Sequence, residues 1–153
     1  MSPLSEFDFT SLLGEEHRDE LERLLFFNGN QARAATGVTF VARRYGLPRI
    51  TVESGWLRVG LGSEVQTQTL YVMRRAITGN VLVGVAIYTR EGDGLVVLYV
   101  AVHEDYSIGG AMANRMLLVR IKDQIAAIGR RIRGIDTLLL YTGRDTPIQI
   151  RLA

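Results

Sequence analysis

The sequence predicts an α+β fold in which a mixed β-sheet is combined with a few helices. Three observations lead to this prediction. Apolar side chains recur at helical spacing before residue 46, and strand-like apolar patterns follow from residue 49. A long amphipathic segment at about 108–132 then joins two apolar runs. An apolar fraction of 47% over 153 residues allows a substantial core, so we expect a single domain over 1–153.

The N-terminal part, residues 1–46, is expected to contain two helices. The first is predicted within residues 5–27, where the side chains at helical spacing are Leu12, Leu13, His17, Leu21, Leu24 and Leu25. Asn28-Gly29-Asn30 ends this segment. A second helix is predicted over 31–45, because Gly46 is a typical C-terminal stop and Pro48 follows it.

From Arg49 onward the apolar pattern becomes that of β-strands, and a mainly antiparallel sheet is expected. Residues 49–62 have the pattern of a hairpin around Glu53-Ser54-Gly55, and 65–75 that of a further strand. The runs 81–89 and 95–103 are almost continuously apolar, which is typical of strands covered on both faces. Glu91-Gly92-Asp93-Gly94 provides a tight turn between these two runs, so they are expected to pair as an antiparallel meander.

A strand–helix–strand unit is predicted near the end of the sequence. The helix is expected at about 108–132 and the next strand at 135–141, with 148–152 as a candidate for one more strand. A helical crossover predicts that 95–103 and 135–141 are parallel neighbours. Core side chains expected in this half are Leu98, Val100, Met116, Ile125 and Leu139.

Composition argues against several classes of function. There are no cysteines and only two histidines, His17 and His103, so no metal site is predicted. The net charge of +2 is small and does not predict a nucleic-acid partner. The start MSPLSEFDF lacks the apolar segment of a secretory signal, and no apolar run approaches the roughly 20 residues that span a bilayer. We therefore expect a cytoplasmic protein without a membrane partner.

The junction between the 95–103 strand and the long helix carries the strongest indication of chemistry. Ser107-Ile108-Gly109-Gly110 is predicted at the helix N-terminus, where N–H groups and the helix dipole favour an anion. His103 and Glu104, at the strand end, are candidate general bases, and Tyr141 is a candidate general acid. Each has a structural alternative, because polar residues commonly end strands, glycines form tight turns and tyrosine is ordinary in strands.

The segment Tyr106-Ser107-Ile108-Gly109-Gly110-Ala111 resembles the signature of the GNAT superfamily of acyl-CoA N-acyltransferases. That signature, Arg/Gln-x-x-Gly-x-Gly/Ala, lies between a strand and a helix and holds the pyrophosphate of the cofactor. Gly109 and Ala111 fit it, whereas Tyr106 stands where Arg or Gln belongs. The resemblance covers about residues 68–141. The family continues beyond this point with a helix and further strands, whereas 12 residues follow Tyr141 here.

The resemblance implies binding of acyl-CoA and transfer of the acyl group to a small-molecule amine, by attack of the amine on the thioester. The residues that it implies for the cofactor are Val100, Val102, Ser107, Ile108, Gly109, Gly110, Ala111 and Arg115. The alternative is a non-enzymatic α+β module that acts as a subunit or adaptor, forming a homo-oligomer through a sheet edge or the long helix. The sequence leaves both interpretations open.

Overall fold

A computed structural model describes residues 6–28, 42–62, 66–107, 109–141 and 147–152. Within these residues the elements follow in the order β1 (Phe7–Thr10), α1 (Arg18–Phe26), β2 (Pro48–Glu53), β3 (Trp56–Leu61), β4 (Gln68–Ala76), β5 (Gly79–Glu91), β6 (Gly94–Val102), α3 (Leu117–Arg130), β7 (Thr137–Leu140) and β8 (Ile148–Arg151). Short 3-10 turns η1 (Glu15–His17), η3 (Glu104–Tyr106) and η4 (Ala113–Arg115) lie between them. The predicted combination of helices with a mixed sheet is confirmed.

The main sheet has the strand order β1-β4-β5-β6-β7-β8. All neighbours in it are antiparallel except β6 and β7, which pair in parallel from Gly94↔Thr137 to Val97↔Leu140. The predicted parallel pairing of 95–103 with 135–141 is therefore confirmed. The 148–152 candidate is also a strand, β8, which pairs antiparallel to β7 and forms an edge of the sheet.

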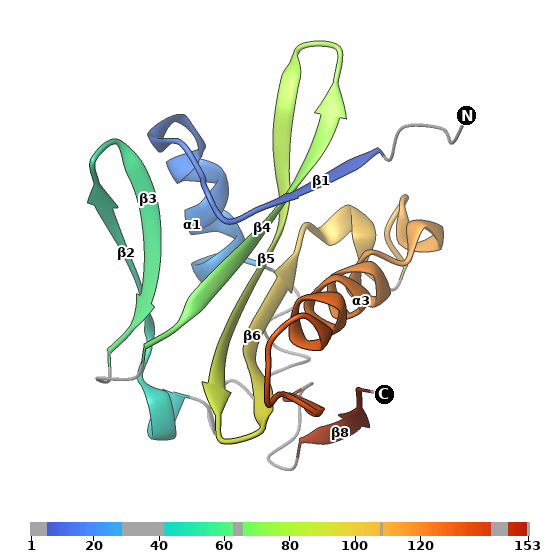
Figure 1. Ribbon diagram of the computed structural model, residues 1–153. Helices are drawn as coiled ribbons and strands as arrows, with labels where there is room; N and C mark the ends of the chain where they lie inside the picture. Colours follow the sequence, from blue (N-terminus) through green and yellow to red (C-terminus); the bar gives the residue numbers. More distant parts are fainter. Residues whose placement is uncertain (1–5, 29–41, 63–65, 108, 142–146, 153) are drawn as a thin grey trace.

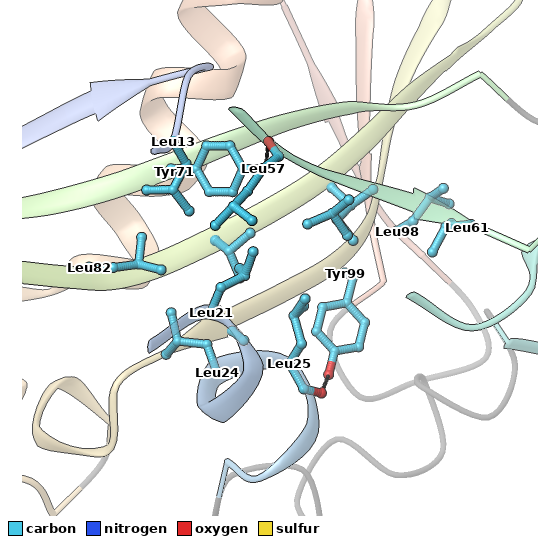
Figure 2. Packing of buried hydrophobic residues seen from close by; sticks show 14 of the residues in the cluster. Leu13, Leu21, Leu24, Leu25, Leu57, Leu61, Tyr71, Leu82, Leu98 and Tyr99 are labelled. Carbon is cyan, nitrogen blue, oxygen red and sulfur yellow. Dashed lines mark hydrogen bonds between the residues drawn. The ribbon is translucent and has the colours of Figure 1, made fainter. Parts of the chain in front are cut away.

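Both faces of the central strands are buried, each under different elements (Figure 1). On one face, leucines of α1 and side chains of β3 pack against β4, β5 and β6 (Figure 2). On the other face, α3 packs against the same strands and β7 through Leu117, Ile121 and Ile125. We call these the α1-side core and the α3-side core. Successive side chains of a strand point to opposite faces, so almost continuously apolar strands require both layers.

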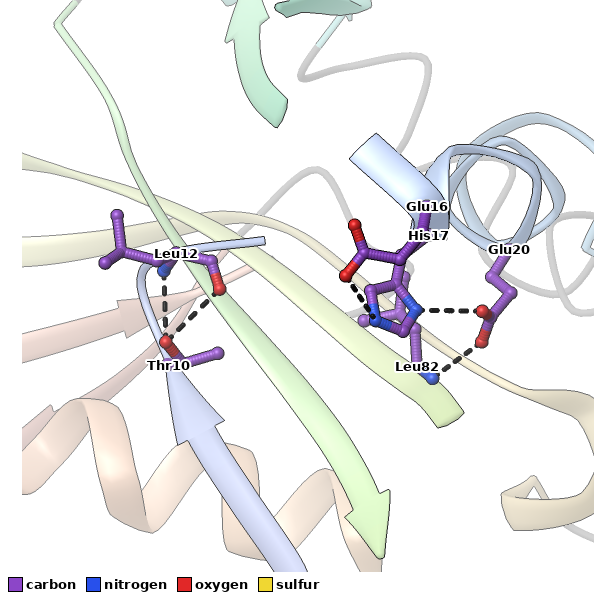
Figure 3. A network of polar contacts seen from close by, with 6 residues as sticks. All are labelled: Thr10, Leu12, Glu16, His17, Glu20 and Leu82. Atoms are coloured by element: carbon purple, nitrogen blue, oxygen red, sulfur yellow. Dashed lines mark hydrogen bonds and ion pairs between the residues drawn. The ribbon is translucent and has the colours of Figure 1, made fainter. Parts of the chain in front are cut away.

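A polar network also fixes α1 to the sheet (Figure 3). The backbone N–H of Leu82 donates a hydrogen bond of 2.7 Å to Glu20 Oε2. The other carboxylate oxygen, Oε1, lies 2.9 Å from His17 Nδ1. Leu82 lies beside an irregularity in the pairing of β4 with β5, at Val72/Met73. A bulge disrupts the regular ladder locally, and here a helix carboxylate accepts the adjacent strand N–H.

The N-terminal prediction needs correction. Residues 7–10 are not helical but form β1, which pairs with β4 from Phe7↔Arg74 to Thr10↔Tyr71, and α1 begins only at Arg18. The helical spacing of the leucines is real for α1, where Leu21, Leu24 and Leu25 are buried. Pairing with a strand far along the chain determined the conformation of 7–10, which local spacing cannot reveal. Of the predicted second helix, residues 42–45 are helical and 31–41 lie outside the described residues.

The 49–62 hairpin is confirmed as β2 and β3, joined by Ser54 and Gly55, which have φ of 53° and 84°. Such positive φ values at both central positions are those of the hairpin turn that matches strand twist. This hairpin forms a separate two-stranded sheet rather than extending the main one. It packs on the α1-side core through Leu57, Val59 and Leu61.

The long helix begins later than predicted, at Leu117 rather than near residue 108. Gly109 has a φ of 84° and Met116 a φ of 53°, and neither angle is compatible with a continuous α-helix. Met116 therefore precedes the helix and is 59% exposed, so its predicted burial is wrong. Leu98 and Ile125 are buried as predicted. Val100 and Leu139 are partly buried against the α3-side and α1-side cores, respectively.

The start of α3 offers a matched test of the packing. Leu117 is fully buried, whereas its neighbour Leu118 is 50% exposed. We expect Leu117→Ala to lower the free energy of unfolding by about 2–5 kcal/mol, because it leaves a cavity in the α3-side core. Leu118→Ala should change it by about 0.5 kcal/mol or less. Urea unfolding of both variants measures this difference, and equal costs would contradict the described orientation of α3.

Candidate functional site

The connection between β6 and α3, residues 103–116, folds onto itself instead of opening a helix. The N–H of Gly110 donates to Ser107 O at 2.9 Å and the N–H of Met112 donates to Asp105 O at 2.6 Å. A Cβ at Gly110 would collide with the carbonyl oxygens of Glu104 and Asp105. The glycine is therefore required by a tight turn. The expected cradle of N–H groups at a helix N-terminus is not what the described residues form, and Ile108 lies outside them.

His103 and Glu104 lie at the C-terminal end of β6, as the sequence indicated. His103 Nδ1 accepts a hydrogen bond of 3.1 Å from the N–H of Asp105, so the ring caps the short η3 turn. Glu104 begins this turn, and its carbonyl oxygen accepts from Ser107 N at 3.1 Å and from Ser107 Oγ at 2.6 Å. These contacts give His103, Glu104 and Ser107 a structural role in shaping the turn.

Tyr106 and Tyr141 lie on opposite faces of the sheet. Tyr106 is buried in the α3-side core, where its ring meets Phe7 edge-on at 5.6 Å. Tyr141 packs against the α1-side core on the other face of the sheet. The Tyr141 N–H donates to Val97 O at 3.3 Å, so Tyr141 lies level with the middle of β6. At the rise of a strand, it is roughly 15 Å along β6 from His103.

The parallel pairing of β6 with β7 stops at Val97, although β6 continues to Val102. Along a strand of an antiparallel pair, the backbone N–H and C=O groups of one residue point to the partner strand, and those of the next residue point away from it. The N–H of His103 bonds to Val83 O. By the same alternation, the backbone N–H and C=O groups of Ala101 and Tyr99 point to β5. Those of Val102 and Val100 point to the opposite side. Along 98–102, no strand of the described chain lies beside β6 on that side.

Two polar contacts that the sequence analysis missed lie at opposite ends of β6, one beside Val102 and one beside Gly94. Asn28, after α1, donates from Nδ2 to Val102 O at 2.7 Å, which confirms that this carbonyl points away from β5. Tyr45 donates from its hydroxyl to Glu91 Oε1 at 2.5 Å. Burial is the main cause that raises the pKa of Tyr45, the bond to the Glu91 carboxylate adds to it, and Tyr141 contributes as well. Tyr45, Glu91 and Tyr141 thus belong to one polar region at the edge of the α1-side core.

Arg115, predicted to meet a phosphate, is directed toward β1. Its Nη1 lies 3.6 Å from Glu6 Oε1. Gly109 keeps open space around its Cα, but its φ of 84° already accounts for the glycine. The described residues contain no group of three His, Asp or Glu side chains that could hold a metal ion. Among the helices of the described segments, none is long and apolar enough to cross a membrane.

Comparison of the chain with protein-family models, with curated protein sequences and with solved structures found no match. The described residues thus provide three features: a section of β6, residues 98–102, with no described strand beside it on one side; a tyrosine–glutamate contact at the other end of β6; and a closed turn after the strand. This section is called the unpaired section of β6.

The Tyr45–Glu91 contact generates a pH-dependent prediction. The raised pKa means that Tyr45 stays neutral in the folded protein at a pH where an unfolded tyrosine, with a pKa of about 10, ionises. The unfolded state then binds fewer protons, so folding stability falls as pH rises above that value. Tyr45→Phe should cost about 1 kcal/mol at pH 7 by removing a hydrogen bond.

The cost should shrink at alkaline pH, because phenylalanine cannot ionise in the unfolded state. Urea unfolding of the wild type and the variant at pH 7 and at about pH 11 measures the difference. Tyr71→Phe is the comparison variant for the role of the carboxylate. Burial raises the pKa of Tyr71 to about 12, and no carboxylate contributes to this shift. An identical gap between wild type and Tyr45→Phe at both pH values would contradict the raised pKa.

Proposed function

We propose that the chain is a GNAT-like protein that binds acyl-CoA along the unpaired section of β6 and transfers the acyl group to a small amine. The observation that carries this proposal is the direction of the Val100 backbone groups, away from β5 and beyond the end of β7. An exposed strand edge binds extended chains through main-chain hydrogen bonds. The pantetheine arm of coenzyme A is such a chain, with amide groups that can donate and accept.

The strand arrangement also supports the proposal. The order of β4, β5, β6 and β7, with one parallel pair joined through α3, agrees with the strand–helix–strand unit that the sequence resemblance implied. Tyr141 follows the last residue of β7, at the point where β6 and β7 separate. A thioester beside Leu98 to Val100 would lie within reach of its hydroxyl.

In the proposed reaction, the amine nitrogen attacks the thioester carbonyl carbon, the carbon–sulfur bond breaks and the thiolate leaves. Tyr141 is assigned the proton that restores the thiol, and the excess proton of the amine passes to water. His103 lies roughly 10 Å beyond Val100 along β6 and Glu104 lies farther still, so neither is assigned a contact with this thioester. The closed turn also removes Gly110 from the phosphate-binding role that the sequence suggested, since its N–H donates to Ser107.

Calorimetry and thermal unfolding with acetyl-CoA and free coenzyme A test the proposal. A ligand at 100 times its dissociation constant should stabilise the fold by about 2.7 kcal/mol. Amide hydrogen exchange then locates the site: the ligand should slow exchange at Val100 and leave Ala101, which already faces β5, unchanged. No heat and no thermal shift with either ligand, or protection elsewhere with none at Val100, would contradict the proposal.

Tyr141→Phe separates binding from transfer. It should leave the affinity for coenzyme A within about twofold and lower the rate of acyl transfer by about 10²–10⁴-fold, the range of a general acid. Tyr88→Phe is a matched control, since Tyr88 lies against the α3-side core on the opposite face. Equal rates for the wild type and Tyr141→Phe would remove Tyr141 from the mechanism.

The second candidate is the non-enzymatic subunit or adaptor. The observation that favours it is an exposed apolar group at the start of α3, formed by Met116, Leu118 and Val119 at 59%, 50% and 40% exposure. Helix faces of this kind are typical of protein contacts. Light scattering during size exclusion decides this: a dimer that Leu118→Glu converts to a monomer supports it, and a monomeric wild type contradicts it.

A further inference from the structure

A cluster of three arginines lies on the α3 side, where β1, β4 and the start of α3 meet. Arg74 comes from β4, Arg115 from the η4 turn and Arg120 from α3. Arg74 contacts Tyr106, Arg120 lies over Phe7, and these two rings meet edge to face; Arg115 is joined to Arg120 through its backbone oxygen. We call these three side chains the arginine cluster. It is distinct from the unpaired section of β6, because Phe7 and Arg74 belong to β1 and β4, on the far side of β5, whereas that section of β6 faces away from β5.

The contacts of Arg74 and Arg120 orient their guanidinium groups without neutralising them. Arg74 Nη1 donates to the hydroxyl oxygen of Tyr106 at 3.4 Å. The Arg120 guanidinium carbon lies 5.3 Å from the centre of the Phe7 ring. Arg120 Nε donates to the backbone oxygen of Arg115 at 3.1 Å. An aromatic ring and a carbonyl therefore hold Arg120, a hydroxyl holds Arg74, and none of these partners carries a full negative charge.

Glu6 forms an ion pair with the cluster: its Oε1 lies 3.6 Å from Arg115 Nη1. For Arg74 and Arg120, no ion pair is found within the described ranges. The first turn of α3 contains no acidic residue, so it does not offset the charge. Cations are favoured at the opposite end of a helix, and like charges close together destabilise each other. Three cations with one carboxylate thus leave an excess of positive charge.

We propose that the arginine cluster binds an oxyanion of the phosphate class, and that Glu6 competes with this ligand. Guanidinium groups form paired hydrogen bonds with phosphate oxygens, and Arg74, Arg115 and Arg120 offer three such groups from three elements. When no ligand is present, the Glu6 carboxylate pairs with Arg115, one of the three groups that would bind the oxyanion. This inference does not require the proposed acyl-CoA site, because free phosphate or any phosphate-bearing metabolite can supply the oxyanion.

Calorimetry with inorganic pyrophosphate at low salt tests the proposal directly. Arg74→Gln and Arg120→Gln should each weaken binding at least about tenfold, the loss expected for one charge-assisted contact. Glu6→Gln should tighten binding, because it removes the competing charge. Arg75→Gln is the matched control. Arg75 neighbours Arg74 on β4 but pairs with Asp8, with Nη2 2.6 Å from Oδ1. The affinity of this variant for pyrophosphate should therefore equal that of the wild type.

Circular dichroism and thermal unfolding confirm that each variant is folded. If Arg74→Gln is not, Arg115→Gln replaces it, since Arg115 is an exposed side chain. Coenzyme A tested on wild type and Arg120→Gln distinguishes the sources of phosphate: an equal loss with both ligands assigns the cluster to the cofactor's phosphates, and a loss with pyrophosphate alone assigns it to another phosphate. No binding of pyrophosphate by wild type or Glu6→Gln, or an equal loss in Arg75→Gln, would overturn the proposal.

Discussion

The burial of β5 and β6 on both faces is the constraint on which the rest of the structure depends. Val85, Ile87 and Val96 point to one face, Val83, Ala86 and Val97 to the other, and all are almost fully buried. Such strands are stable only when apolar layers cover both sides, at roughly 25 cal/mol for each Å² removed from water. α1 with the β2–β3 hairpin covers one face and α3 covers the other (Figure 1).

The same constraint places the features that the function would use. Because α3 crosses over to cover one face, β7 returns parallel to β6, but it pairs only as far as Leu140. The rest of β6 keeps its apolar side chains in both cores while the backbone of Val100 points away from β5. The chain between β6 and α3 closes into short turns, and it delivers Tyr106 and Arg115 to the β1 side. The strand edge and the arginine cluster therefore arise from the way α3 is connected.

The sequence was informative where one pattern dominates a segment. The apolar runs and the Gly92–Asp93 turn predicted β5 and β6, and the amphipathic segment predicted α3 and its parallel crossover to β7. β1 was missed because Phe7 and Phe9 pair with β4, more than sixty residues away, which no local spacing reveals. The start of α3 was misplaced because helical spacing of Met112 and Met116 continues through residues that turns hold in a non-helical conformation.

The candidate site was less predictable for the same reason. Tyr45 meets Glu91, Asn28 meets Val102 and Arg74 meets Tyr106, and each pair comes from distant parts of the chain. Only the assembled sheet brings them together. The glycines of the 107–110 segment did mark a turn, but the structure shows that the turn uses its own N–H groups at Gly110 and Met112.

Amide-resolved hydrogen exchange of the ligand-free protein tests the central claim most directly, namely that the side chains of β6 pack into both cores while the backbone of Val100 points away from β5, on a side where no described strand pairs with it. The account predicts slow exchange at Tyr99 and Ala101, whose N–H groups face β5, and fast exchange at Val100 between them. Equal protection at all three amides would contradict it, because a further strand or segment would then have to pair with this edge of β6.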